Sequence, residues 1–316
     1  MKTKLFNLMT VFALIVAAIG CTSVPASVLP TQAPMQLTAD QLVAKIPVGS
    51  SPFRLEIGEG AVWVANGGDN TISKIDPQTN QVLATIKTGK NPLGIAVGAG
   101  AVWVANNDDG SVSRIDPESN QVVATIQVGS SPRNVAANSD SIWVAHDPNA
   151  VSRIDPNNNQ VIATIKVKDK PTQLAISANT IWVASKGSDT IVQIDLKTNQ
   201  VVTEVKVGYH TIAMAAAGDA IWVTGESNPQ VARIDLETNQ IVAWIDVGSS
   251  SWGIAIANDG VWVATNSDNT ISKIDPNTNQ VVATFEVGSK PFGIAVGDGM
   301  LWVANNGDNT VWRIKP

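Results

Sequence analysis

The feature that most constrains this chain is a tryptophan that recurs at a nearly fixed interval. Seven Trp residues flanked by aliphatic residues lie 40, 40, 39, 40, 40 and 40 positions apart: Trp63, Trp103, Trp143, Trp182, Trp222, Trp262 and Trp302. A period in this range is the sequence mark of a repeat fold, in which each copy forms one supersecondary unit. The fold must therefore be built from seven copies of one small element.

Each repeat contains four short segments with the composition of β-strands. In the second repeat they span 93–97, 101–105, 111–115 and 122–128, which are rich in Val and Ile and separated by Gly, Asn, Asp and Ser. No part of the repeat places apolar residues at helical spacing over three turns. Four strands in about 40 residues match a propeller blade. The sequence thus predicts an all-β, seven-bladed β-propeller of four-stranded blades.

Two residue types recur along the chain, and we assign both to the scaffold. The repeated Trp is expected to fill the wedge between neighbouring blades, where an aromatic side chain buries a large area. An Asp recurs in the turn between the third and fourth strands of six repeats, at Asp76, Asp116, Asp155, Asp195, Asp235 and Asp275. Because Asp and the Asn that follows it favour tight turns, we interpret these carboxylates as turn residues rather than metal ligands or catalytic acids.

The two ends of the repeat region predict how the ring closes. Residues 311–316 have the pattern of a third strand, and the sequence then stops without a fourth. Residues 41–49 match the fourth-strand pattern of the other repeats. We therefore expect this N-terminal strand to complete the last blade, in a three-plus-one closure that removes an open sheet edge.

The segment before the repeats has the features of an exported, processed leader. Lys2 and Lys4 precede a nearly unbroken apolar run, 5–19, which is short for a membrane span and typical of a secretory signal. The run ends in Ala-Ile-Gly-Cys, which resembles a bacterial lipobox in which Cys21 is lipidated. The alternative is an ordinary cleaved signal with an incidental cysteine.

This interpretation divides the chain into three parts and gives it a location. The signal peptide with its lipobox occupies 1–21, a flexible tether with Pro, Ser and Thr occupies 22–40, and the propeller occupies 41–316. The protein is then expected to be exported and held on the bacterial cell envelope by its lipid anchor alone, facing the periplasm or the cell exterior. We expect it to be a monomer.

Charge and cysteine content narrow the functional classes. The formal net charge is −6 and no basic stripe is present, which argues against nucleic acid as a partner because phosphate contacts need grouped cations. Cys21 is the single cysteine, so the propeller has no internal disulfide or cysteine nucleophile. Runs of Asn, Asp and Gly such as 66–70 lack the EF-hand pattern and are assigned to turns. We predict no metal and no cofactor.

The repeat resembles that of a known family. The run Ile-Asp-Pro-x-Thr-Asn-x-Val-Val-Ala-Thr-Ile-x-Val-Gly, carried almost unbroken within 270–297, is similar to the 40-residue YVTN β-propeller repeat of bacterial surface and periplasmic proteins. Segment 62–75 is also similar to the blade motif of streptogramin B lyases, which are seven-bladed. The Gly-His and Trp-Asp signatures of WD repeats are missing. Both resemblances imply the fold, whereas propellers host many activities.

The lyase resemblance also implies an enzymatic alternative. That family uses a His general base, acidic residues and a magnesium ion on one face of the ring, and the matching residues here would be His210, His146 and Glu226. After the aromatic strand the lyase motif has Thr-Glu, where this chain mostly has Ala-Asn; Thr224-Gly225-Glu226 comes nearest and is shifted by one residue. We therefore favour a non-catalytic binding module over a lyase of the virginiamycin B type.

Departures from the repeat indicate where a ligand would bind. In the usual propeller topology, the loops between second and third strands share one face with the loops between blades. The residues near that face that depart from the repeat are polar or aromatic: Phe53, Arg54, Arg133, Asn134, Gln173, Tyr209, His210, Trp252 and Phe292. A concave mouth with a few polar groups is the usual form of a ligand site. We predict that this face binds a small molecule, a glycan or a protein, the alternative being neutral variation in surface loops.

One carboxylate breaks the repeat inside the innermost strand. Glu56 stands where the other six repeats have Ala, and it lies two residues from Arg54, hence on the same side of that strand. A charge near the axis of the ring should be paired. The sequence leaves two interpretations open, an ion pair with Arg54 or a contact with a ligand.

Overall fold

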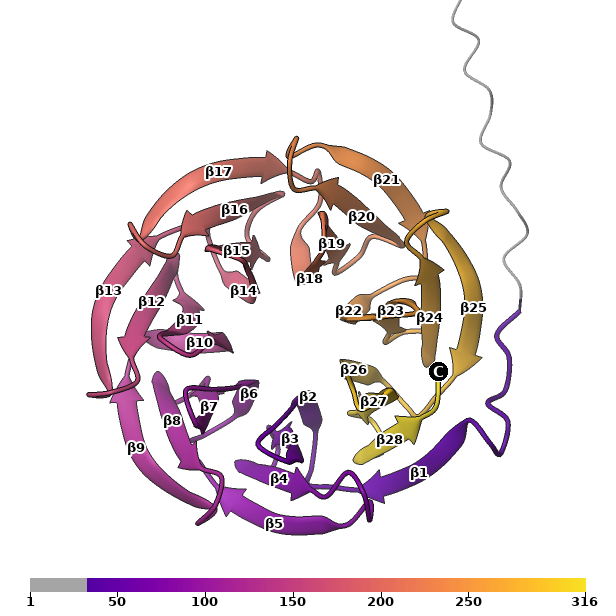
Figure 1. Ribbon diagram of the computed structural model, residues 1–316, viewed down its shortest axis with the longest axis horizontal. Coiled ribbons are helices and arrows are strands. Elements are labelled where there is room, and N and C mark those ends of the chain that lie inside the picture. The colour runs from indigo at the N-terminus through magenta and orange to yellow at the C-terminus, as the bar shows by residue number, and fades with distance from the viewer. Residues whose placement is uncertain (1–32) are drawn as a thin grey trace, which may run out of the picture. The chain divides into compact units, whose positions relative to one another are not determined.

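The computed structural model describes residues 33–316, which form 28 β-strands in seven antiparallel sheets around one axis (Figure 1). The predicted all-β, seven-bladed propeller of four-stranded blades is confirmed. The predicted signal peptide, Cys21 and the first part of the tether lie outside the described residues. Within 33–316, no helix has the length and apolar character needed to cross a membrane.

The strands of each blade follow one another from the innermost to the outermost. Blade 1 comprises β2 (Pro52–Gly58), β3 (Ala61–Asn66), β4 (Thr71–Ile75) and β5 (Val82–Lys87); blade 2 comprises β6 (Pro92–Gly98), β7 (Ala101–Asn106), β8 (Ser111–Asp116) and β9 (Gln121–Gln127). Blade 3 comprises β10 (Ser130–Ala137), β11 (Ile142–Asp147), β12 (Ala150–Asp155) and β13 (Gln160–Lys166); blade 4 comprises β14 (Pro171–Ser177), β15 (Thr180–Ser185), β16 (Thr190–Asp195) and β17 (Gln200–Lys206). Blade 5 comprises β18 (Thr211–Ala217), β19 (Ala220–Gly225), β20 (Gln230–Asp235) and β21 (Ile241–Asp246); blade 6 comprises β22 (Ser251–Ala257), β23 (Gly260–Thr265), β24 (Thr270–Asp275) and β25 (Gln280–Glu286).

Blade 7 is completed by the N-terminal strand, which confirms the three-plus-one closure. Its inner strands are β26 (Pro291–Gly297), β27 (Met300–Asn305) and β28 (Thr310–Ile314), and β1 (Leu42–Pro47) forms its outer strand. The register runs antiparallel from Leu42 opposite Ile314 to Pro47 opposite Thr310. Figure 1 shows β1 beside β28, with the C-terminus on the same blade. The sheet therefore joins the two ends of the repeat region.

The segment just before β1 adds to the outer edge of blade 6. Met35, which falls within the predicted tether, forms a parallel bridge with Phe285 of β25. Its N–H donates to the Thr284 carbonyl at 2.8 Å, and its own carbonyl accepts from the Glu286 N–H at 2.9 Å. The propeller unit thus includes residues that precede residue 41.

The repeated tryptophans are buried between blades, as predicted. Each lies on the second strand of its blade, and all seven are at most 2% exposed. Trp103 of blade 2, for example, packs against Val135, Ile142 and Val144 of blade 3. Trp302 packs in the same way across the closing seam, against Leu55 and other residues of blade 1. The core of the molecule is therefore a ring of seven inter-blade clusters.

The turns between third and fourth strands carry the capping contacts expected of them. Asp76 accepts hydrogen bonds from the Gln78 N–H at 2.8 Å and from the Thr79 hydroxyl at 2.8 Å, and these bonds lower the pKa of its carboxyl. Asn80 takes a φ of 61°, and its counterparts in the other five turns lie between 56° and 58°. The repeated Asp and Asn residues are thus turn residues, as the sequence indicated.

A basic side chain opposite the tryptophan connects most neighbouring blades. In blade 2, Arg114 stacks over the Trp103 ring, with its Cζ 5.2 Å from the ring centroid, and donates to the Pro156 carbonyl at 2.8 Å and to the Asn159 Oδ1 at 3.0 Å. We call this contact the inter-blade clamp. Lys74, Arg153 and Arg233 make equivalent clamps with both hydrogen bonds, and Arg313 makes the one to the Asn80 Oδ1 at 3.0 Å.

The seam between blades 4 and 5 lacks the clamp. Gln193 occupies the basic position opposite Trp182, and its amide donates to Thr180 of its own blade at 3.2 Å. The Asn239 Oδ1, which the clamp would reach, is buried without a hydrogen-bond partner. This seam is held by apolar packing around Trp182, Met214 and Ile221, without the polar link.

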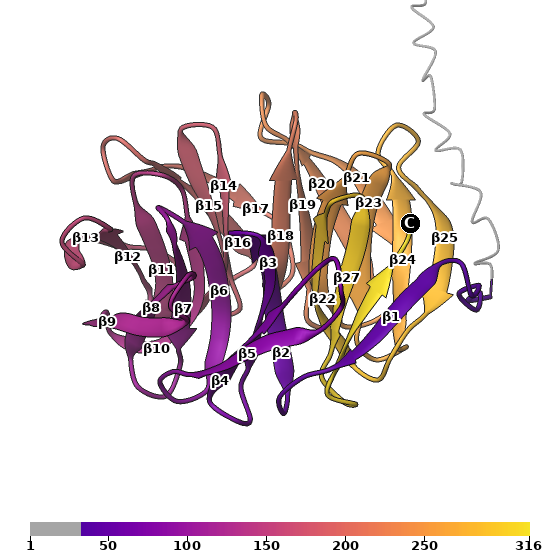
Figure 2. The ribbon, with the colours of Figure 1, turned by 60° about the horizontal axis from the view of Figure 1, so that its bottom comes forward.

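One face of the ring carries both the loops between blades and the loops between second and third strands. The Gly67 N–H, in a loop of the second kind, donates to the Ser51 carbonyl, in a loop of the first kind, at 3.0 Å. Figure 2 gives a side view of the ring, in which loops extend beyond the strands at both faces. This loop face is where the sequence analysis placed the departures from the repeat.

Candidate functional site

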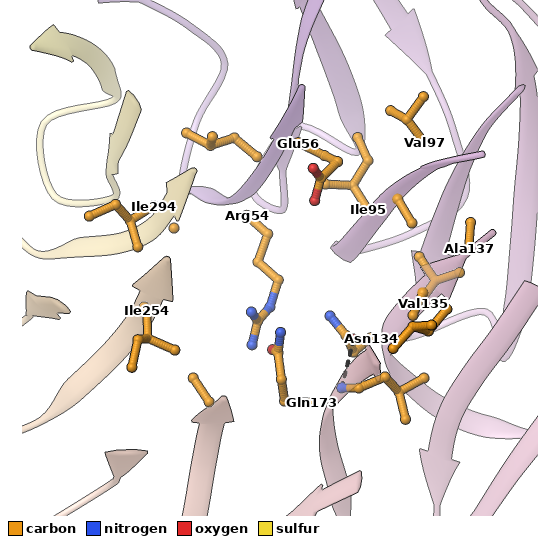
Figure 3. A pocket seen from close by; sticks show the side chains of 18 residues that line it. Arg54, Glu56, Ile95, Val97, Asn134, Val135, Ala137, Gln173, Ile254 and Ile294 are labelled. Atoms are coloured by element: carbon orange, nitrogen blue, oxygen red, sulfur yellow. Dashed lines mark hydrogen bonds between the residues drawn. The ribbon is translucent and has the colours of Figure 1, made fainter. Parts of the chain in front are cut away.

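Within residues 33–316, the inner strands line a cavity along the axis of the ring, here called the channel. It has a volume of about 280 Å³ and is lined by inner strands of six blades, β2, β6, β10, β14, β22 and β26, with Ala213 from β18 (Figure 3). Most of its exposed wall is polar, although Ile95, Val135, Ile254 and Ile294 are among the lining residues. A concave cavity onto which polar groups converge has the form of a small-molecule site.

Two tiers of side chains follow from the repeat. The upper tier, nearer the loop face, comprises Arg54, Gly94, Asn134, Gln173, Ala213, Gly253 and Gly293. The lower tier lies two residues further along each inner strand and comprises Glu56, Ala96, Ala136, Ala175, Ala215, Ala255 and Ala295. The polar side chains of the upper tier come from blades 1, 3 and 4, and the one polar side chain of the lower tier, Glu56, comes from blade 1.

Close approach of the inner strands explains the glycines of the upper tier. A Cβ atom on Gly94 would lie 2.5 Å from the Cα of Asn134, and one on Gly293 would lie 2.7 Å from the carbonyl oxygen of Phe53. Real Cβ atoms do not come so near to backbone, so glycine is needed where neighbouring strands meet this closely. Three of the seven positions thus hold glycine for a steric reason, whereas three others carry a polar side chain.

Arg54 is the charged group of the upper tier. It extends from β2 into the channel (Figure 3), and its Nε is buried without a hydrogen-bond partner. None of the salt bridges among residues 33–316 involves Arg54. Burial lowers the pKa of the guanidinium to about 10, and Glu56 offsets part of that effect. At neutral pH the channel therefore holds a positive charge without a contacting carboxylate.

Two amide side chains complete the polar part of the upper tier. The Oδ1 of Asn134 accepts a hydrogen bond from the Leu174 N–H at 3.0 Å, which leaves its NH₂ group as the free donor (Figure 3). The Oε1 of Gln173 is buried and has no partner. With Arg54, these amides offer several hydrogen-bond donors to the same cavity. Such a set suits an oxygen-rich anion.

Glu56 does not form the ion pair that the sequence left open. No salt bridge joins it to Arg54, and in Figure 3 the two side chains point in different directions. The hydrogen bond that its carboxylate accepts comes from the Ile57 N–H at 3.3 Å. Burial raises the pKa of Glu56 above its usual value, because desolvation outweighs that hydrogen bond and the attraction of Arg54.

Three predicted aromatic residues from blades 1, 6 and 7 lie together, each directly before an upper-tier residue. The centroids of Phe53 and Phe292 are 4.4 Å apart, and those of Trp252 and Phe292 are 4.9 Å apart. Lys186 reaches over Trp252, with its Nζ 5.9 Å from the ring centroid. This contact is not predictable from the sequence, because Lys186 of blade 4 and Trp252 of blade 6 come together only in the folded ring.

The other predicted ligand-binding residues have partners outside the channel. Arg133 forms a salt bridge with Asp147 at 3.0 Å on the loop face of blade 3. The Tyr209 hydroxyl donates to the Val223 carbonyl at 2.8 Å, its ring meets that of Trp244 edge-on at 5.7 Å, and burial raises its pKa. Both side chains are engaged in packing and pairing on the loop face.

The three residues of the enzymatic alternative are not brought together. His210 is exposed and shares a pocket of about 200 Å³ with Glu226, on the loops of blade 5. Glu226 is paired with Lys186 at 2.6 Å. His146 lies in blade 3 and is 6% exposed. Among residues 33–316, no three His, Cys, Asp or Glu side chains are grouped so that they could hold a metal ion.

His146 occupies a structural position of the repeat. Its Nε2 is 2.9 Å from the Ser152 hydroxyl, and its Nδ1 is 3.2 Å from the Asp147 carbonyl. At the same position in blade 1, the Asn66 amide donates to the Ser73 hydroxyl at 2.9 Å. Burial lowers the pKa of His146, so the neutral imidazole takes the place of that amide.

Comparisons with known proteins bear on the fold alone. Neither family models nor curated proteins give a match to the chain. Among solved structures 1733 chains match, one of them a chain of the hydrazine synthase of Kuenenia stuttgartiensis, with a TM-score of 0.78 at 17% identity over 92% of this chain and 99% of that one. At this identity the likeness shows a shared β-propeller fold.

Proposed function

We propose that this protein is a non-catalytic binding propeller whose axial channel takes a small anionic ligand, such as a carboxylate. The observation that carries the proposal is Arg54, a half-buried cation with no contacting carboxylate and a buried, unpartnered Nε. Withdrawing an unpaired charge from water costs free energy, and a bound anion would offset that cost. The Asn134 NH₂ group supplies a further donor beside it, and Gln173 lines the same cavity.

The setting of this site is also a proposal. The 40-residue repeat supports membership of the YVTN type, and the leader supports a lipoprotein held on the outside of a bacterial membrane by Cys21. In that position the loop face would meet solutes of the envelope. The channel mouth, with its Phe53, Trp252 and Phe292 wall, is where such a solute would enter.

The streptogramin-lyase alternative has one supporting observation and two against it. His210 and Glu226 share a pocket, as a base and an acid would. Glu226 is however already paired with Lys186, and His146 is buried two blades away in a hydrogen-bonded position. Metal-dependent turnover of a cyclic depsipeptide that is lost in His210→Ala would favour this alternative.

The test of the binding proposal is a melting-temperature titration of the full chain with acetate, propionate and phosphate at constant ionic strength. A ligand that binds the native state stabilises it by mass action, by about 2.7 kcal/mol at 100 times its Kd. We expect a carboxylate to raise the melting temperature of the wild type and not that of Arg54→Met. Arg133→Gln is the matched control, because Arg133 lies on the same face and is already paired; this variant should respond like the wild type. Equal responses in Arg54→Met and wild type would refute the proposal.

A further inference from the structure

The axial channel contains two opposite charges that do not contact each other. Arg54 and Glu56 lie on one strand, β2, and both line the same cavity. No salt bridge joins them. We propose that the ligand carries a cation as well as an anion: a small amino acid or related zwitterion, whose carboxylate contacts Arg54, Asn134 and Gln173 and whose ammonium contacts Glu56. This proposal rests on the anion-binding function proposed above.

The position of Glu56 in the repeat argues that its charge is not needed by the fold. The other six blades have alanine in the lower tier, and they build the same inner strand with it. Glu56 accepts one long hydrogen bond, from the N–H of its neighbour Ile57. A carboxylate in such surroundings lacks the partners that buried charges normally have. A cationic ligand group would supply that partner.

The separation of the two charges is the second argument. Residues two apart on a strand have their Cα atoms roughly 6.6 Å apart and face the same side, so an Arg and a Glu at this spacing are within reach of each other. A direct ion pair would satisfy both groups without any ligand. Instead, in Figure 3 the guanidinium of Arg54 extends toward Gln173, away from the carboxylate of Glu56. The arrangement keeps an anion-binding end and a cation-binding end apart within one cavity.

The size and wall of the cavity set the size of the ligand. A volume of about 280 Å³ lies near the lower end of the range for small-molecule pockets. At about 30 Å³ for each water-sized group, it would hold roughly nine such groups. The lining residues Ile95, Val135, Ile254 and Ile294 would contact methylene groups between the two charged ends. A single amino acid fits these limits, and a peptide of several residues does not.

The test compares ω-amino acids with alkanoates of the same carbon number, from two to six carbons, by calorimetric titration of the full chain. A charge-assisted hydrogen bond is worth about 1.5–3 kcal/mol, so at least one ω-amino acid should bind about tenfold more tightly than its alkanoate. In Glu56→Gln this preference should reverse, because removal of the negative charge favours the plain alkanoate. Glu56→Ala, which restores the residue of the other six blades, should give the same reversal and guards against a folding defect.

The outcomes separate this inference from the binding proposal beneath it. If alkanoates bind to the wild type and depend on Arg54, but no ω-amino acid binds more tightly, the ligand is a simple anion and the zwitterion proposal is wrong. The same conclusion follows if the preference for an ω-amino acid survives in Glu56→Gln and Glu56→Ala. If no alkanoate binds, or if binding is unchanged in Arg54→Met, the anion-binding function itself fails.

Discussion

The seam between blades 4 and 5 offers a direct test of how the blades are held together. Replacing Gln193 with Arg would install the clamp that five other seams possess. The partners are already in place: the Asn239 Oδ1 is buried without a hydrogen bond, and Asn239 has the same φ, 57°, as Asn120, a clamp acceptor in blade 2. We predict that Gln193→Arg stabilises the protein.

The expected gain can be estimated from the clamp of blade 2. An Arg at 193 would stack over Trp182, as Arg114 stacks over Trp103, for about 0.5–1 kcal/mol. It would also donate charge-assisted hydrogen bonds to Leu236 O and Asn239 Oδ1, each worth about 1.5–3 kcal/mol. Ordering the long side chain costs about 2 kcal/mol, and the Gln193–Thr180 bond is lost. The net gain should lie between about 0 and 4 kcal/mol; its middle value, about 2 kcal/mol, corresponds to roughly 3 °C in melting temperature for a domain of this size.

Calorimetry on Gln193→Arg would measure this gain, with Arg153→Gln as the mirror-image control. Arg153 clamps blade 3 to blade 4 through Leu196 O at 2.8 Å and Asn199 Oδ1 at 3.0 Å, so its replacement should lower the melting temperature by a similar amount. The reasoning is refuted if Arg153→Gln destabilises the protein while Gln193→Arg has no effect or lowers its stability. The acceptors at the fourth seam would then not lie where the repeat places them.

Three further predictions test other parts of the structure, each by thermal unfolding. Ile46→Ala should cost about 2–4 kcal/mol because Ile46 is 4% exposed in the closing seam, whereas Val43→Ala on the exposed side of β1 should cost under about 0.5 kcal/mol; equal effects would contradict the closure. His146→Asn should reduce the loss of stability between pH 7.5 and pH 5. Burial lowers the pKa of His146 in the folded state below its usual value, so the unfolded chain binds the proton first and the wild type loses stability as the pH falls. An undiminished loss would show that His146 is not its source. Glu56→Gln should be more stable than the wild type at pH 8 and not at pH 4, since burial raises the pKa of Glu56 above 4.5 and the cost of its ionisation grows as the pH rises; a constant difference across this range would oppose that assignment.

The fold was largely predictable from the sequence because it is set by patterns that recur. The Trp period gave the number of blades, and the match of 41–49 to a fourth strand gave the closure, since pairing β1 with β28 satisfies an edge that would otherwise stay open. The position of His146 was also readable: it aligns with Asn66, whose amide bonds a serine that blade 3 retains as Ser152.

The site was less predictable, because it depends on side-chain directions and on contacts between blades. Alternation along β2 places Arg54 and Glu56 on one side of the strand, but it cannot say whether they point toward each other. Likewise, the sequence does not show whether Arg133 or Arg54 has a carboxylate partner. Only the structure shows that Asp147 pairs with Arg133 and that no salt bridge in 33–316 involves Arg54.

The most direct test of the central claim is the melting temperature of the ligand-free double variant Arg54→Ala/Glu56→Ala at pH 7. Ala213 holds the upper-tier position in blade 5, and alanine holds the lower-tier position in six blades, so the variant returns blade 1 to residues that the scaffold already uses. If the two charges are kept for a ligand, removing them should raise stability by about 1–3 kcal/mol, or roughly 2–5 °C. A melting temperature below that of the wild type would mean that Arg54 and Glu56 support the fold, and would contradict the account.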